Sequence, residues 1–248
     1  MGARAPRQLW RAFSPMARGA ILALSLWGPG QGALAQTITA AAYAEPTDRY
    51  DHAVLGDALE WGALRLTLSD GSERLYRLPE ALVFEDIAPR LADVDGDGAP
   101  EVIVVETALA TGARLAVWGA EGRRAATPHI GQTHRWLAPV GAADFDGDGK
   151  IEIAVVDRPH LARILTLWRY EAGSLRLAAT ASGFTNHRIG WDYIAGGVRQ
   201  CAGAPEMIVA DPDWRRILAV RFDGAQVTAK DLGRYSAEAM RAATLCRG

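Results

Sequence analysis

The chain has 248 residues, a formal net charge of −2, and 49% hydrophobic and 23% charged residues. These fractions are typical of a soluble globular protein. A slightly acidic chain is a poor partner for nucleic acid or for anionic membrane surfaces, so we expect neither.

The first 35 residues differ from the rest. They carry Arg4, Arg7, Arg11 and Arg18 with no acidic residue, then an apolar run over residues 20–27, and end on Ala33-Leu-Ala35. A basic start, a short apolar run and small residues before a cleavage point are typical of a secretory signal peptide.

Cleavage there removes four of the 27 basic residues and leaves 23 against 29 acidic ones, a net charge of −6 for the mature chain. We therefore expect a mature chain of residues 36–248, exported to a periplasmic or extracellular compartment. No later segment suggests insertion into a membrane.

A weak repeat unit is expected over residues 37–80, where short β-like runs surround an acidic segment without regular spacing. The strand near residues 37–43 could complete a blade together with the C-terminus. Stronger units follow over residues 84–128, 135–182 and 189–232, before a tail at 233–248. Each strong unit has an apolar, β-branched run after a loop, which predicts a buried strand. Periods of this size indicate propellers or solenoids. In the tail, residues 236–244 are the best helix candidate, with Ser236 as N-cap.

The loops at residues 93–101 and 144–152 have the pattern Asp-x-Asp-Gly-Asp-Gly-x-x-Glu. Oxygen ligands at alternate positions suit Ca²⁺, and the glycines let the backbone wrap around an ion. The expected ligands, in about two Ca²⁺ sites, are the carboxylates and the position-7 carbonyls: Asp93, Asp95, Asp97, Ala99 and Glu101; Asp144, Asp146, Asp148, Lys150 and Glu152.

Two alternatives apply to these loops. An EF-hand needs a glutamate at position 12 and a following helix, whereas Val104 and Val155 occupy that position and strand-like runs follow. Ordinary acidic turns without an ion remain the second alternative. In the last unit, the corresponding loop keeps only Glu206 of the acidic positions, so we expect no ion there.

Cys201 lies in that degenerate loop, and Cys246 is the only other cysteine. Two cysteines in an exported chain most simply form one disulfide. The alternative is two free thiols.

The two acidic loops, each entering an apolar strand at a period of about 50 residues, resemble the FG-GAP/VCBS repeat of integrin-alpha-type β-propellers. This resemblance implies an all-β fold, a small propeller with calcium loops between the first and second strands of a blade. Integrin-type propellers have seven blades, while this length allows about four. A closed four-bladed ring is the first expectation and an open half-ring that dimerises is the second; the oligomeric state stays open.

Each unit also carries an acid at the far end of its second strand, which in a propeller would form a ring at the channel mouth. Two similar His-Arg pairs enter consecutive units on the same side. The candidate ligand face is therefore Asp57, Glu106, Asp157 and Asp211 with His134, Arg135, His187 and Arg188. The alternative is that the acids cap turns and the arginines pair with them.

The function predicted from these features is a non-catalytic binding or interaction module with a protein or carbohydrate ligand. No nucleophile elbow, zinc pattern or phosphate loop is present. A periplasmic hydrolase-like enzyme, with a site built from His134, His187 and the acid ring, is the alternative function.

Overall fold

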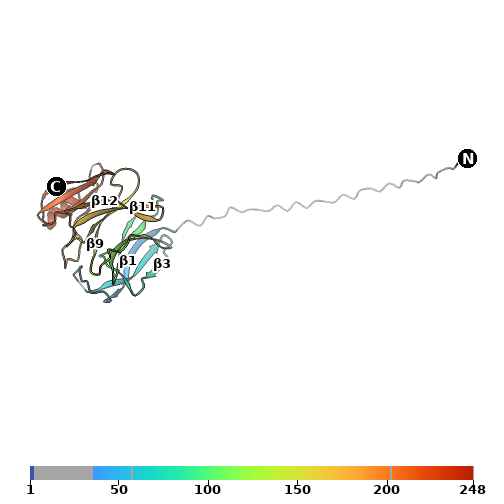
Figure 1. The fold of residues 1–248 in the computed structure, drawn as a ribbon, viewed down its shortest axis with the longest axis horizontal. Coiled ribbons are helices and arrows are strands. Elements are labelled where there is room, and N and C mark those ends of the chain that lie inside the picture. Colours follow the sequence, from blue (N-terminus) through green and yellow to red (C-terminus); the bar gives the residue numbers. More distant parts are fainter. Residues whose placement is uncertain (3–35, 57, 202, 248) are drawn as a thin grey trace. The chain divides into compact units, whose positions relative to one another are not determined.

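The protein is described from a computed structural model, which covers residues 1–2, 36–56, 58–201 and 203–247. The compact unit comprises Gln36–Gly248, and all that follows concerns it (Figure 1). The predicted signal peptide falls almost entirely outside the described residues. Among the described helices, none has the length and apolar character that a membrane span needs.

The fold is all-β, with several antiparallel sheets and a β-propeller-like organisation in which short strands follow one another in chain order. We divide it into four modules. Modules 1 and 2 share an eight-stranded sheet, because Phe84 pairs with both Trp61 and Glu106. Module 1 consists of β1 (Ile38–Thr47), β2 (Glu60–Leu68) and β3 (Glu73–Arg77). Module 2 consists of β4 (Leu82–Phe84), β5 (Arg90–Ala92), β6 (Glu101–Ala108), β7 (Gly112–Gly119) and β8 (Gly122–Ala126).

Modules 3 and 4 are separate four-stranded sheets in which each strand pairs with its neighbour in sequence. Module 3 consists of β9 (Leu137–Ala143), β10 (Glu152–Asp157), β11 (Ile164–Glu171) and β12 (Ser174–Ser182). Module 4 consists of β13 (Gly197–Arg199), β14 (Glu206–Ala210), β15 (Arg216–Phe222) and β16 (Val227–Arg234). Helix α1 (Ala237–Thr244) follows, and the side chain of Ser236 accepts a hydrogen bond from Ala239 N, as the N-cap prediction requires.

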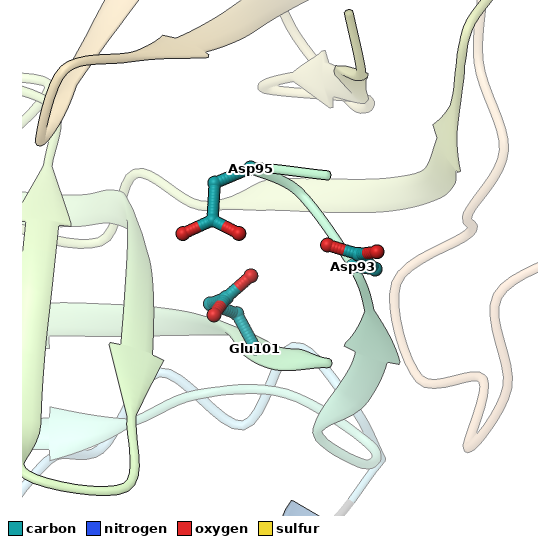
Figure 2. A group of neighbouring side chains, drawn as sticks. All are labelled: Asp93, Asp95 and Glu101. Carbon is teal, nitrogen blue, oxygen red and sulfur yellow. The ribbon is translucent and has the colours of Figure 1, made fainter. Parts of the chain in front are cut away.

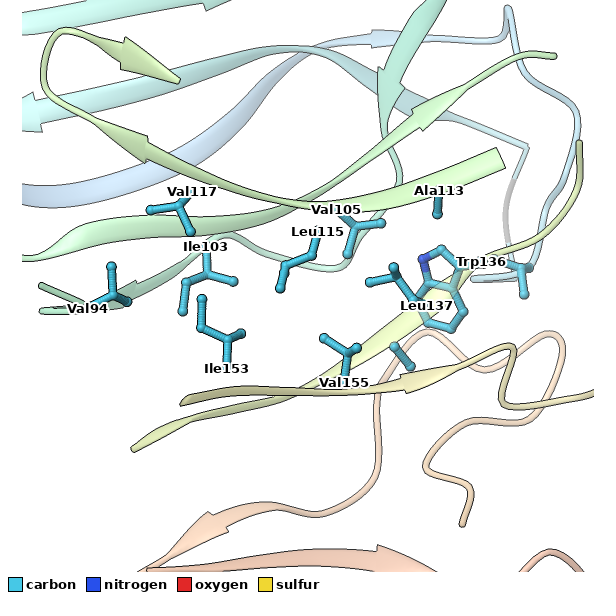
Figure 3. Close-up of a cluster of buried hydrophobic side chains, with 12 residues drawn as sticks. Val94, Ile103, Val105, Ala113, Leu115, Val117, Trp136, Leu137, Ile153 and Val155 are labelled. Carbon is cyan, nitrogen blue, oxygen red and sulfur yellow. The ribbon is translucent and has the colours of Figure 1, made fainter. Parts of the chain in front are cut away.

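The strands predicted to be buried are covered on both faces. Every residue of β6 except the last is buried, and so is every residue of β10 except the last. In Figure 3, side chains of β6 and β7 such as Ile103 and Leu115 face Ile153 and Val155 of β10, with Trp136 closing one end. A continuous apolar run is stable in this position because both of its faces meet a neighbouring sheet.

The prediction that the first strand completes a blade with the C-terminus is wrong. β1 pairs with β2 along its whole length, from Ile38 with Leu68 to Thr47 with Glu60. Within the described residues, the partner of β16 is β15. The β1–β2 hairpin forms instead because these strands are neighbours in sequence. Pairing β1 with β16 would require closing a loop of almost the whole mature chain, at a larger cost in entropy.

Candidate metal centre

The loop between β5 and β6 is folded around the side chain of Asp93. Its two carboxylate oxygens accept hydrogen bonds from Gly96 N at 2.8 Å and Gly98 N at 2.9 Å. Both glycines have positive φ, 75° and 87°, which is where a residue without a Cβ is favoured. An added Cβ would meet no atom within 4 Å at either position. The glycines are therefore required by backbone conformation and not by space.

The loop between β9 and β10 repeats this arrangement almost atom for atom. Asp144 accepts from Gly147 N at 2.8 Å and from Gly149 N at 2.9 Å, and these glycines have φ of 78° and 85°. The glutamate that ends each loop also bonds back into it. Glu101 accepts from Val94 N and Glu152 from Phe145 N, both at 3.1 Å.

Three carboxylates converge in each loop. Asp93, Asp95 and Glu101 each offer an oxygen within 4.8 Å of the other two, and so do Asp144, Asp146 and Glu152. Figure 2 shows the carboxylates of Asp95 and Glu101 facing one another, with Asp93 beside them. Carboxylate oxygens are the donors that hard divalent cations prefer, so each of these groups could hold a metal ion.

The third aspartate of each loop lies outside these groups. The carboxylate of Asp97 accepts from the N–H of Ala99 at 2.8 Å, and that of Asp148 accepts from the N–H of Lys150 at 2.9 Å. The ammonium of Lys150 pairs with Glu171 at 2.7 Å. Asp97 thus serves its turn, whereas Asp148 also pairs with the guanidinium of Arg169 at 3.0 Å.

An arginine that the sequence analysis did not identify reaches each carboxylate group. Arg124 of β8 donates to Asp95 at 2.8 Å and to Glu101 at 2.6 Å. Arg169 of β11 donates to Glu152 and Asp146, both at 2.6 Å. A guanidinium therefore already places positive charge between the same oxygens that would hold a cation.

The two arginines contact the loop carboxylates from different positions in their sheets. Arg169 lies directly opposite Glu152 in the β10–β11 ladder. Arg124 instead passes over Gly119, where an added Cβ would lie 2.4 Å from its Nε. The absence of a side chain at residue 119 is what lets an arginine from the next strand reach Glu101.

Both glutamates are deeply buried, with side-chain exposures of 2% for Glu101 and 0% for Glu152. Burial raises the pKa of each carboxyl above its ordinary value of 4.5, although the hydrogen bonds from the loop backbone and the neighbouring arginine act in the opposite direction. A buried carboxylate needs nearby positive charge to remain ionised. In each loop the neighbouring arginine supplies that charge.

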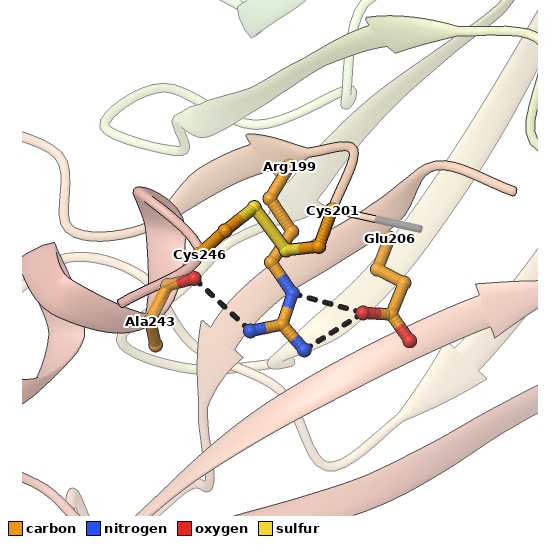
Figure 4. The surroundings of a disulfide bond; sticks show 5 residues. All are labelled: Arg199, Cys201, Glu206, Ala243 and Cys246. Atoms are coloured by element: carbon orange, nitrogen blue, oxygen red, sulfur yellow. Dashed lines mark hydrogen bonds and ion pairs between the residues drawn. A yellow bond between two sulfur atoms is a disulfide. The ribbon is translucent and has the colours of Figure 1, made fainter. Parts of the chain in front are cut away.

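Module 4 lacks the acidic loop but keeps the ion pair. Glu206 is contacted by Arg199 and Arg221, at 2.7 and 2.6 Å. Beside this pair, Cys201 and Cys246 form a disulfide, as Figure 4 shows, and Arg199 also donates to Ala243 O. The expected disulfide is present in the structure.

The predicted acid ring does not form a convergent site among the described residues. Glu106 is fully buried, contacts Arg114 and Arg123, and accepts a hydrogen bond from the Trp118 indole at 2.8 Å. Asp157 pairs with Arg158, and Asp211 accepts from two backbone N–H groups of its own turn. Asp57 lies outside the described residues. Asp211 thus serves its turn, as the alternative expected, but the arginines that contact Glu106 and Asp157 are Arg114, Arg123 and Arg158 and not Arg135 or Arg188.

The two His-Arg pairs take different positions. His134 contacts Asp51 at 2.8 Å, while the Arg135 guanidinium donates to the carbonyl of His134. His187 is buried and contacts His160 at 3.0 Å. Arg188 lies over the rings of Trp191 and Trp214, 5.5 and 4.9 Å from their centroids.

His52, Glu85 and His160 were not singled out from the sequence, yet they lie in the same region as His134 and His187. The imidazole Nδ1 of His52 contacts the buried carboxylate of Glu85. These residues come from different modules at irregular spacing. The feature of the sequence that could have pointed to His52 and His160 is the scarcity of histidine, with five in the chain.

Residues 85–155 match the family model of the FG-GAP-like repeat. The matched segment includes both acidic loops, strand β6 and the first four residues of β10. No curated protein and no solved structure matches the chain.

Proposed function

From the premise that this is an FG-GAP-like repeat protein, we propose that it is an exported, calcium-stabilised β-propeller-like interaction module of about four blades. An FG-GAP repeat on a β-rich fold suggests a protein-interaction module. Its ligand would be a protein or a carbohydrate. The Cys201–Cys246 disulfide supports an oxidising compartment.

The observation that carries the calcium proposal is the duplication of one loop geometry in modules 2 and 3. In both, the first aspartate organises the loop through two glycine N–H groups, and the third aspartate closes the following turn. That leaves the second aspartate and the buried glutamate directed toward each other. The carboxylates of Asp93, Asp95 and Glu101 would hold one ion, and those of Asp144, Asp146 and Glu152 the other. A bound ion would take the place of the guanidinium that contacts each carboxylate pair and offset the repulsion between the carboxylates, so its binding free energy would stabilise the fold.

The test is thermal unfolding of the mature protein, recovered after export, in EDTA and then in excess Ca²⁺. A first residue of Gln36 in its mass spectrum checks the cleavage prediction. At 100-fold excess over Kd, each site adds about 2.7 kcal/mol, and each kcal/mol raises Tm by roughly 2–4 °C for a chain of this size. We expect a Ca²⁺-dependent rise of at least about 5–10 °C.

The matched variants separate ion binding from loss of an acidic turn. Asp95→Asn with Asp146→Asn keeps the size of both side chains and should abolish the Ca²⁺-dependent rise. Asp70→Asn, which alters an acidic turn of module 1 outside both carboxylate groups, should retain it. Equal Ca²⁺ responses in all three proteins would show that these loops are ordinary acidic turns.

A further inference from the structure

A cavity of about 260 Å³ lies where the linkers between modules meet. It is lined by the segment before β2, the linker entering module 3, the β10–β11 turn and the linker entering module 4. Of the chain's five histidines, three line this cavity and a fourth, His187, contacts one of them. The lining residues are His52, His134, Arg135, Trp136, Arg158, Pro159, His160, Leu161 and Ile189.

Each lining imidazole is held by one ring nitrogen. His52 uses Nδ1 toward Glu85, His134 uses Nε2 toward Asp51 at 2.8 Å, and His160 uses Nε2 toward His187 at 3.0 Å. The second ring nitrogen of His52 and of His134 makes no hydrogen bond within the described residues. The cavity is therefore lined by three imidazoles whose contacts fix their orientation.

Glu85 is the buried anchor of this arrangement. Its side chain is completely buried and accepts a second hydrogen bond from the hydroxyl of Thr107 at 2.6 Å. Burial raises its pKa, against the opposing effect of His52. A buried carboxyl that uses its oxygens on an imidazole and a hydroxyl positions His52 and does not itself face the cavity.

A metal ion is a poor occupant of this cavity. Among the described residues, the groups whose ligand atoms come within 4.8 Å of one another are the two acidic loops, and the histidines form no such group. Three ligands bound to one ion must approach more closely than these imidazoles do.

Two guanidinium groups give the cavity an affinity for anions. Arg135 makes no ion pair within the described chain, and its one hydrogen bond runs to the His134 carbonyl. Arg158 uses Nε and Nη2 on Asp157, which leaves Nη1 without a partner among the described residues. Guanidinium groups bind carboxylate and phosphate oxygens well because their planar N–H groups match the anion's geometry.

Backbone conformation supports a functional role for the same place. Ala53, His134 and Arg158 all have positive φ, of 49°, 53° and 46°. Such conformations are unfavourable for residues with a Cβ and tend to gather at binding sites, where the surrounding structure holds them. His134 and Arg158 are themselves lining residues, and Ala53 follows the lining residue His52.

The remaining walls are apolar, formed by Trp136, Pro159, Leu161 and Ile189. Polar residues of the lining already donate hydrogen bonds to three carboxylates, those of Asp51, Glu85 and Asp157. Their charge disfavours a dianion such as a phosphate monoester. The volume is also below the roughly 300–1,000 Å³ typical of drug-sized ligands, so the occupant must be small.

We infer that this cavity binds a small organic monocarboxylate, with its carboxylate on the N–H groups of Arg135 and Arg158 that face no partner within the described residues and its apolar body against Trp136 and Leu161. This site is separate from the acidic loops and does not depend on the calcium proposal.

The experiment is an NMR titration of the mature protein in Ca²⁺ at pH 7, following the imidazole signals while benzoate is added. Benzoate should shift the ring signals of His52 and His160 in a saturable way. His129, whose Nδ1 contacts Gly112 O in module 2, should not respond. Benzamide has the same ring without the charge and should bind at least tenfold more weakly.

Arg135→Gln should weaken benzoate binding at least tenfold and leave benzamide unchanged. Arg176→Gln removes an arginine from the surface of module 3, with its side chain 71% exposed, and should change neither. If Arg135→Gln does not fold, Arg158→Gln takes its place. Equal binding of benzoate and benzamide, equal effects of the two arginine variants, or binding of inorganic phosphate as strong as that of benzoate would each overturn the proposal.

Discussion

His160 and His187 lie in surroundings that disfavour the charged imidazolium. Burial, with smaller contributions from His187 and His52, lowers the pKa of His160 from 6.5 to about 4. Burial also lowers the pKa of His187. The native protein therefore binds a proton at these rings more weakly than the unfolded chain does. The stability that comes from the neutral rings is present above pH 6.5 and is lost as the pH falls toward about 4.

The variant His160→Gln tests this linkage. An amide can still donate to His187 but takes up no proton, so the variant should lose less stability than the parent between pH 7 and pH 5. The measurement is urea unfolding at both pH values, compared as the difference between them for each protein. Parallel losses in the two proteins would show that His160 does not contribute to the acid sensitivity.

At the residue scale, the sequence predicted that the carboxylates of each loop gather, including Asp97 and Asp148, which lie outside the two groups, and it did not predict what the carboxylates contact. Asp93 and Asp144 could be identified because one loop contains the whole pattern, with glycines where φ must be positive. Arg124 and Arg169 could not be identified, because whether each guanidinium contacts the loop carboxylates depends on strand register. For Arg124 it also depends on the space left by the missing side chain of Gly119. The partners of His52 and His160 likewise come from segments that meet only after the modules pack.

At the scale of elements, strands and the C-terminal helix were predictable because each depends on local pattern. The β-branched runs predict β6, β10 and β14, and Ser236 is the N-cap of α1, as predicted. The packing of α1 was not predictable, because its buried residues, Met240 and Ala243, form no extended apolar stripe. They cover β14 and β15 in a core cluster with Ile208 and Ile217.

The disulfide should hold α1 against module 4. It joins residues 45 positions apart, and the chain-entropy model gives a stabilisation of about 4 kcal/mol for a loop of that length. Cys201→Ser with Cys246→Ser should therefore lower the free energy of unfolding by about 2–4 kcal/mol. Hydrogen exchange should accelerate first in α1.

Ser236→Ala provides the comparison, since it removes the N-cap and leaves the disulfide intact. Loss of such a cap costs about 1 kcal/mol. If the cysteine variant were no less stable than the cap variant, the disulfide would not be what anchors the helix.

At the scale of the whole compact unit, the core clusters follow chain order. One joins modules 1 and 2, the next modules 2 and 3, the third modules 3 and 4, and the last joins module 4 to α1. Modules 1 and 4 meet through loops, where Gly190 N donates to Val54 O at 3.0 Å. The described strands form no closed sheet, and the helix covers apolar surface of module 4 that would otherwise be available to another sheet.

This arrangement makes α1 a cap, and a terminal repeat without its cap exposes apolar surface. Met240→Asp places a charge at a position only 2% exposed and should detach the helix from β14 and β15. Truncation of a buried methionine alone costs about 2–5 kcal/mol, so Tm should fall by roughly 5–15 °C.

The uncovered face should also cause concentration-dependent self-association, measured by sedimentation equilibrium against the parent chain. Ala237→Asp alters an exposed position in the first turn of the same helix and should change neither property. If Met240→Asp associated no more than Ala237→Asp, the face beneath α1 would not need covering, and the order of the core clusters would not explain where the fold ends.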